Sequence, residues 1–161
     1  MTKAAKPKTV IGRVEKIALP ELALTELHAR IDTGAQTSAV WASHVEVVND
    51  CLEVVFLGKE HPNYTGKKYY FDEFTHGMVA SSNGQAELRY KVKVLVHIGG
   101  KKVRVTFTLA NRATQVYPVL VGRNILRGKF LVDIKLGDPL TKLERERSRK
   151  LQQTNPKGDS K

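Results

Sequence analysis

The sequence predicts an all-β domain, either a barrel or a sandwich, and three observations lead to this fold class. Short apolar segments alternate with polar residues at the spacing of β-strands, turn residues separate these segments, and helix signals are few. The chain has 161 residues, of which 41% are hydrophobic and 7% aromatic. This composition is enough for one modest core, so we expect a single domain.

The first strands are expected within residues 8–19 and 27–31, where apolar and polar positions alternate. The second of these segments leads directly into an Asp-Thr-Gly tripeptide. Residues 45–57 are rich in Val and Phe and are interrupted by Asn49-Asp50, a favourable turn pair. This pattern predicts two strands joined by a tight turn.

The clearest hairpin lies in the second half of the chain. Residues 88–96 and 103–109 both alternate strictly, and Gly99-Gly100 between them is a hairpin turn signal. Residues 119–121 form a short apolar segment that ends at a glycine. We expect three further strands here.

Two segments have helical character. Residues 123–127 precede Gly128, which can end a short helix. Residues 140–153 carry charges of alternating sign and few apolar side chains, which is typical of a solvent-exposed helix.

The formal charge of +11 is concentrated at the two ends of the chain. Residues 1–10 hold +3 and residues 141–161 hold +4, since seven bases face three acids there, so the body holds only +4. This distribution favours solvated tails over a nucleic-acid surface. We expect a disordered extension over residues 1–8, a folded domain over residues 9–137, and a charged tail, partly helical or disordered, over residues 138–161.

The chain has neither a secretory signal nor an apolar run of about 18–20 residues that could span a membrane. We therefore expect a cytoplasmic protein without a membrane partner. Its single cysteine, Cys51, excludes a disulfide within the chain and is expected to fill space in a strand.

Asp32, Thr33, Gly34 and Ala35 follow the second predicted strand and are the candidate catalytic loop. A carboxylate that activates water must be held rigidly. The Thr33 hydroxyl can hydrogen-bond within the loop, and Gly34 leaves space for another backbone or a substrate. The same tripeptide also forms ordinary turns, so it does not identify a catalytic site alone.

A second motif, Val-Leu-Val-Gly-Arg-Asn-Ile-Leu, occupies residues 119–126. Together with the Asp-Thr-Gly loop it resembles the retropepsins, in which a hydrophobic-hydrophobic-Gly segment passes behind the catalytic loop and a short helix follows. The resemblance covers roughly residues 8–135. It implies a closed acid-protease β-barrel with one short helix after Gly122-Arg123, and it implies that these two residues support the loop.

The chain is more closely similar to a bacterial family of small retropepsin-like proteins, the RimB type. The shared motifs are Ala-Arg-Ile-Asp-Thr-Gly-Ala-x-Thr-Ser-Ala at residues 29–39, Ser-Ser-Asn-Gly at residues 81–84 and Leu-x-Asn-Arg at residues 109–112. Members are often labelled ATP-dependent zinc proteases and are encoded near an ATP-grasp enzyme that adds glutamates to a ribosomal protein. The resemblance therefore implies a link to a ribosomal protein or to an ATP-grasp glutamate ligase pathway.

The residues do not support the zinc and ATP of that label. A P-loop requires Gly-x-x-x-x-Gly-Lys-Ser/Thr, and no Gly-Lys pair here is followed by Ser or Thr. The histidines lack the spacing of a zinc motif; they are His28, His44, His61, His76 and His97. We expect no cofactor and no metal ligand, with a zinc site assembled by folding as the alternative.

The resemblance implies the chemistry of an aspartic peptidase, in which two carboxylates share one proton. One carboxylate acts as base on a bound water, and the other donates a proton to the scissile carbonyl. Asp32 lies in the only Asp-Thr/Ser-Gly of the chain. The second carboxylate must then come from a second copy, so we expect a homodimer with Asp32 of both copies at its axis, acting on a peptide or protein substrate.

Substrate contacts are expected from Gln36, beside the catalytic loop, and from His76 and Gly77 in a hairpin flap. We place the tip of this flap within residues 72–77, and the turn at residues 81–84 is the alternative. An ordinary surface hairpin is a competing interpretation.

Viral retropepsins usually have acidic residues after the alanine, one of which pairs with the later arginine. Gln36 removes that partner, which leaves Arg123 to bond loop carbonyls or a carboxylate of the other subunit, such as Asp133. A neutral Gln36 and a basic body suit acidic or glutamylated protein tails as substrates.

Three other functions remain open. The fold can serve a non-proteolytic peptide-binding or regulatory dimer linked to ribosomal-protein modification, since fold does not guarantee activity. The basic tails can serve an RNA- or ribosome-associated module, which would bind with steep salt dependence. The third is zinc-dependent hydrolysis.

Overall fold

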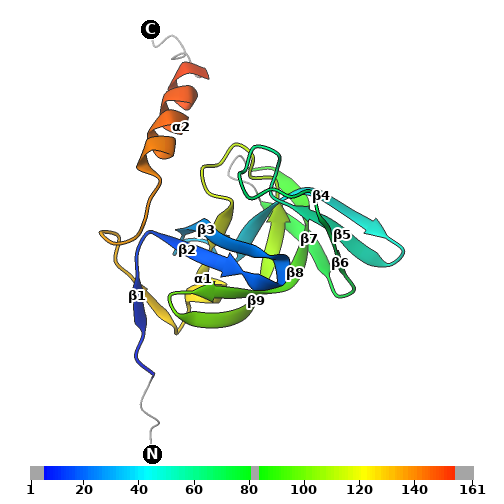
Figure 1. The fold of residues 1–161 in the computed structure, drawn as a ribbon, viewed down its shortest axis with the longest axis horizontal. Coiled ribbons are helices and arrows are strands. Elements are labelled where there is room, and N and C mark those ends of the chain that lie inside the picture. The colour runs from blue at the N-terminus through cyan, green and yellow to red at the C-terminus, as the bar shows by residue number, and fades with distance from the viewer. Residues whose placement is uncertain (1–5, 81–83, 155–161) are drawn as a thin grey trace, which may run out of the picture.

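The computed structural model describes residues 6–80 and 84–154 of the chain. Strands dominate this part, and the helices are short or peripheral (Figure 1). The elements are β1 (Thr9–Ile11), β2 (Val14–Leu19), the 3-10 helix η1 (Pro20–Leu22), β3 (Leu24–Ile31), β4 (Ser38–Val48), β5 (Cys51–Phe56), β6 (Lys68–Phe71), β7 (Thr75–Ala80), β8 (Ala86–Ile98), β9 (Lys101–Ala110), β10 (Val119–Val121), α1 (Arg123–Leu126), β11 (Phe130–Val132) and α2 (Thr141–Thr154).

Six strands close into a barrel, which confirms the predicted fold class. Their order is β10-β3-β2-β8-β9-β4, and β10 also pairs with β4, so that the ring has no open edge. β10 runs parallel to β3 and antiparallel to β4. The interior is filled by apolar side chains from all six strands, and its fully buried members include Ile17, Leu27, Val40, Val92, Phe107 and Val119.

The two predicted tight turns are present. Gly99 and Gly100 both have positive φ, 55° and 76°, and join β8 to β9. Asn49 and Asp50 also have positive φ, 49° and 64°, and join β4 to β5. Two successive residues of positive φ match the right-handed twist of a hairpin, which is why these residue types occur here.

Two parts of the fold extend beyond the barrel. β4, β5 and β6 continue as a ribbon to one side of it (Figure 1). β1 pairs in parallel with β11, in a separate two-stranded sheet. The single strand expected over residues 8–19 is divided at Gly12, where a side chain would overlap the backbone of Leu136.

The C-terminal helix α2 projects away from the barrel (Figure 1). None of its residues is buried. No helix in the described part of the chain has the length and apolar character needed to cross a membrane.

Candidate active site

Asp32 lies directly after β3, in a turn held by main-chain hydrogen bonds. Its N–H donates to the carbonyl of Val121 at 2.9 Å, and its own carbonyl accepts from the N–H of Ala35 at 3.2 Å. The Gly34 N–H donates to Asp32 Oδ1 at 3.0 Å. A side chain at Gly34 would come within 3.3 Å of that oxygen, so the glycine allows a close approach of carboxylate and backbone. The turn therefore orients a partly exposed carboxylate.

Thr33 and Gln36 are exposed on the same loop, and Ala35 is half-buried. The Thr33 hydroxyl makes no hydrogen bond within residues 6–80 and 84–154, so the expected bond within the loop is not formed. These side chains are available to a substrate or a second molecule.

Gly122 and Arg123 support the loop from behind through their main chains. The Arg123 N–H donates to the Ala35 carbonyl at 2.8 Å. A side chain at Gly122 would overlap the Thr37 carbonyl and lie 2.9 Å from the Ala35 oxygen, so only glycine fits there. The Arg123 side chain is exposed, and the bond to a loop carbonyl comes from its backbone rather than its guanidinium.

Ser38 and Asn124 connect the loop, the helix and the barrel wall, and the sequence did not single out either residue. Ser38 Oγ accepts from the Gly122 N–H at 2.9 Å and donates to Asn124 Oδ1 at 2.7 Å. Asn124 Nδ2 donates to the Thr106 carbonyl at 2.8 Å. Ser38 is fully buried, which makes this network a rigid support. A serine directly before the apolar residues 39–42 was the available signal for it.

Arginine side chains gather beside Asp32. Arg30 lies two positions before Asp32, so both side chains leave the strand on the same face. The partly buried Arg112 interacts electrostatically with both of them. Burial lowers the pKa of Arg112 to about 10, nearby Arg30, Arg89 and Arg147 act in the same direction, and the Asp32 charge opposes the shift. Arg112 remains a cation at neutral pH.

The segment in which a flap was expected forms a hairpin of β7 and β8. The two strands pair from Thr75–Lys91 to Ala80–Ala86, so residues 75–77 lie within a strand. The tip expected within residues 72–77 is wrong, because residues 72–74 connect β6 to β7 and these strands belong to different pairings. Of the alternative turn at residues 81–84, residues 81–83 lie outside the described part.

His76 and Gly77 lie within β7 rather than at a tip. They pair with Tyr90 and Arg89 of β8, and the His76 ring contacts the Tyr90 ring edge-on at a centroid distance of 6.1 Å. Arg89 Nε is buried without a hydrogen-bond partner among the described residues. The arginine of the hairpin was missed by sequence reasoning and is a further candidate for substrate contact.

One group of possible metal ligands is found within residues 6–80 and 84–154: His44, Glu46 and Glu53. His44 Nε2 lies 2.8 Å from Glu53 Oε2 and 3.7 Å from Glu46 Oε2. Glu53 also accepts a hydrogen bond from Tyr70 and forms an ion pair with Lys68, so protein cations and donors already satisfy it. The cluster sits at the far end of β4 from Ser38, away from the Asp32 loop. The absence of a metal cofactor stays a prediction.

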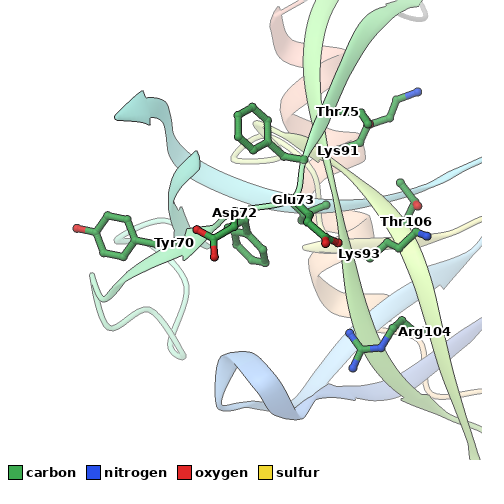
Figure 2. Close-up of a pocket in the computed structure, with 11 residues that line it drawn as sticks. Tyr70, Asp72, Glu73, Thr75, Lys91, Lys93, Arg104 and Thr106 are labelled. Carbon is green, nitrogen blue, oxygen red and sulfur yellow. The ribbon is translucent and has the colours of Figure 1, made fainter. Parts of the chain in front are cut away.

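A cavity of about 730 Å³ lies between the β6–β7 connection and the strands β8 and β9. Figure 2 shows Asp72 and Glu73 on one wall and Lys93 and Arg104 on the other. Its lining does not include Asp32, so this cavity is separate from the candidate active site.

Comparison with known proteins identifies the relatives of the barrel. The family model described as "Retropepsin-like aspartic endopeptidase RimB", of the RimB-like family, matches residues 10–138. A crystal structure of the protein Lpg0085 from Legionella pneumophila, of unknown function, superposes with a TM-score of 0.64 at 27% identity, covering 81% of this chain and 97% of that one.

Curated relatives are larger proteins with a different name. "Probable alpha-L-glutamate ligase" from Shewanella pealeana is 32% identical over 130 residues, and the protein of the same name from Shewanella halifaxensis is equally similar. Each match covers 78% of this chain but 28% of the relative, so the chain spans less than a third of the length of these proteins.

Proposed function

Because this chain belongs to the RimB-like family of retropepsin-like aspartic endopeptidases, we propose that it hydrolyses peptide bonds with two Asp32 carboxylates, one from each copy of a homodimer. The observation that carries the proposal is the Asp32 turn. At the end of a barrel strand, the partly exposed Asp32 carboxylate accepts from the Gly34 N–H, and the Asp32 main-chain N–H donates to the Val121 carbonyl. The chain has no second Asp-Thr/Ser-Gly.

In this mechanism the two Asp32 side chains share one proton, because two carboxylates in contact cannot both ionise. The ionised carboxylate removes a proton from water, and the resulting hydroxide attacks the scissile carbonyl. The protonated carboxylate donates to the carbonyl oxygen. The tetrahedral intermediate then breaks the C–N bond as a proton passes to the leaving amine, and the shared proton is restored.

The β1–β11 sheet supports a dimer at this face. Val10 and Leu131 are paired on it, and 51% and 53% of their surfaces are exposed. Ile134, which follows β11, is 76% exposed. β1 leads into Arg13, whose carbonyl accepts from the Ile31 N–H at 2.9 Å, one residue before Asp32. An exposed apolar surface that adjoins the catalytic loop is suited to contact a second copy.

The arginines beside Asp32 support an acidic substrate. Arg112 interacts electrostatically with Asp32, Arg30 and Arg89. Arg89 pairs with Glu87 through Nη2, but its buried Nε has no partner among the described residues. Guanidinium groups bind carboxylates with two parallel hydrogen bonds. The name of the ligase relatives points to the same chemistry, so we propose that acidic or glutamylated protein tails are the substrate class.

Cleavage of a peptide that ends in four glutamates, followed by mass spectrometry, tests the function. We expect the wild-type chain to release glutamate-containing products, and the Asp32→Asn variant to be inactive at an unchanged melting temperature. Asp50→Asn is the matched control, since Asn tolerates the positive φ at this turn. Sedimentation should show a dimer under the assay conditions.

Full activity in Asp32→Asn, or activity in a strictly monomeric chain, would contradict the proposal. A wild-type dimer that binds the peptide without cleaving it would instead identify a peptide-binding protein. A peptide ending in four glutamines separates acidic specificity from general peptidase activity.

A further inference from the structure

A second feature of the site is a pocket of about 240 Å³ that four arginines line. We call it the arginine pocket and define it by Arg13, Arg30, Arg112 and Arg147, with Tyr117 among its other walls. It adjoins the catalytic loop, because Arg30 leaves β3 on the face of Asp32 and Arg112 interacts electrostatically with Asp32. A substrate bound at Asp32 would therefore have this pocket beside it.

A carboxylate from the same chain already occupies the arginine pocket. Glu144 of α2 forms a two-pronged ion pair with Arg13, with Nη1 3.0 Å from Oε1 and Nη2 3.3 Å from Oε2. The hydroxyl of Tyr117 donates a further hydrogen bond to Glu144. Although partial burial opposes it, these bonds hold the pKa of the Glu144 carboxyl below its usual range. The pocket therefore provides the hydrogen-bond donors and the positive electrostatic potential that stabilise a bound carboxylate.

Glu144 neutralises only part of the positive charge. Arg112 Nε and Arg147 Nε donate to the main-chain carbonyls of Tyr117 and Thr114, which carry no full charge. Arg30 makes no side-chain hydrogen bond or ion pair with any residue that the structure describes. Four guanidinium groups therefore face one carboxylate, and acidic ligands are attracted to the same place.

The segment that supplies Glu144 is weakly attached. α2 has no buried residue, and its backbone meets the barrel domain chiefly around residue 140, where the Leu140 N–H donates to the Tyr117 hydroxyl at 3.0 Å. The helix also begins beyond residue 138, where the family match ends. A segment held mainly by polar contacts at its first turns can detach at low cost.

We propose that Glu144 is an internal ligand of the arginine pocket, and that α2 and the acidic side chain of a peptide compete for it. The occupied pocket is the closed state. Because Arg147 belongs to α2, an acidic peptide binds to Arg13, Arg30 and Arg112 after α2 has left the pocket. The choice of an acidic peptide rests on the proposed function, but the competition concerns binding and requires no catalysis.

Calorimetric titration with tetraglutamate tests the competition in the full-length chain. Glu144→Gln removes the competing charge and keeps the size of the side chain, so we expect the Kd for tetraglutamate to fall about fivefold or more. Glu146→Gln removes the same charge from the same helix at a position that does not line the pocket, and its Kd should stay at the wild-type value. Tetraglutamine should bind neither variant more tightly than it binds the wild-type chain.

Hydrogen exchange of the wild-type chain gives a second measurement that is independent of any substitution. Saturating tetraglutamate should speed amide exchange in residues 140–148, as α2 leaves the pocket, and tetraglutamine should not. An unchanged or weaker affinity in a folded Glu144→Gln variant would overturn the proposal, as would unchanged or slower exchange in this segment of the peptide-bound chain.

The two proposals can fail separately. If Glu144→Gln binds tetraglutamate more tightly but the chain has no peptidase activity, the peptidase function is wrong and the competition is still supported. Cleavage that requires Asp32, with a peptide affinity that is unchanged in Glu144→Gln, would support the peptidase function and remove the competition.

Discussion

The hydroxyl oxygen of Ser38 lies 2.7 Å from Asn124 Oδ1 and joins the strand after the catalytic loop to the helix behind it. The same oxygen accepts the Gly122 N–H, so one buried atom satisfies two groups of a segment that lies 84 or more residues further along the chain. The position of the Asp32 turn therefore depends on a serine that would not contact the substrate.

Replacing Ser38 with Ala should destabilise the barrel and misplace the loop. The Gly122 N–H and Asn124 Oδ1 would both lose a buried partner, which costs about 1–3 kcal/mol in the free energy of unfolding. Urea denaturation measures this loss. Ser43 of β4 is exposed, and Ser43→Ala should change the free energy by no more than about 0.5 kcal/mol. Equal effects of the two substitutions would contradict the supporting role of Ser38.

Gly122→Ala should be more damaging, because its methyl group would overlap the Thr37 carbonyl. Relief requires movement of the main chain that carries the catalytic turn, so we expect a loss of about 3 kcal/mol or more, together with loss of activity. Gly128→Ala is the control. Its side chain would meet open space, and only the positive φ of 75° is strained, which costs on the order of 1 kcal/mol. Thermal denaturation and the peptide assay distinguish the two.

Arg112→Gln should stabilise the fold while it weakens the binding of acidic peptides. Burial and neighbouring arginines lower the pKa of Arg112 to about 10 from 12.5, so its charge is disfavoured in the folded state. Glutamine removes this charge and can still donate to the Tyr117 carbonyl, and we expect a gain on the order of 1 kcal/mol in unfolding free energy. Affinity for tetraglutamate should fall about tenfold, because a charged donor is lost.

The lowered pKa of Arg112 also predicts how the stability gained in Arg112→Gln depends on pH. The folded chain releases the Arg112 proton at lower pH than the unfolded chain, so stability of the wild type rises as pH increases through about 10. The difference between Arg112→Gln and wild type should be constant below about pH 9 and shrink above pH 10. Denaturation series at several pH values would show this; a difference that grows with pH would be inconsistent with it.

Peptidase activity should be insensitive to metal chelation, because the proposed reaction activates water with carboxylates alone. An excess of EDTA should leave the rate unchanged. His44→Ala should also retain activity, since the cluster of His44, Glu46 and Glu53 lies away from the Asp32 loop. Loss of activity with EDTA and its recovery on adding zinc would instead support the zinc-dependent alternative.

The sequence predicted the barrel and the central hairpins because both depend on local patterns. Alternation of apolar residues marked β8 and β9, and pairs of turn residues marked the ends of β4 and β8. The Asp32 turn and the helix after Gly122 were recognisable because their motifs are contiguous. These features require no knowledge of which segments meet in space.

Features that depend on distant contacts were missed. The flap tip was placed wrongly because the glycine and aromatic residues of residues 72–77 resemble a turn, whereas residues 75–77 pair with β8 within a strand. Nothing local links Ser38 to Asn124 or Arg13 to Glu144, which are 131 residues apart in the second case. Arg30 and Arg112 belong to the motifs at residues 29–39 and 109–112. Their proximity beside Asp32 was not predictable, because it depends on how the barrel closes.

The pairing of β1 with β11 has a consequence for how such a domain can be built into larger proteins. The two strands are parallel, so the chain enters this sheet at Thr9 and leaves it past Val132 at the opposite end, and β1 and α2 point in opposite directions (Figure 1). A domain whose chain enters and leaves in opposite directions is suited to being joined in line with another domain, whereas insertion into a loop favours neighbouring ends. This modular geometry accommodates the observation that the barrel matches little more than a quarter of the ligase relatives.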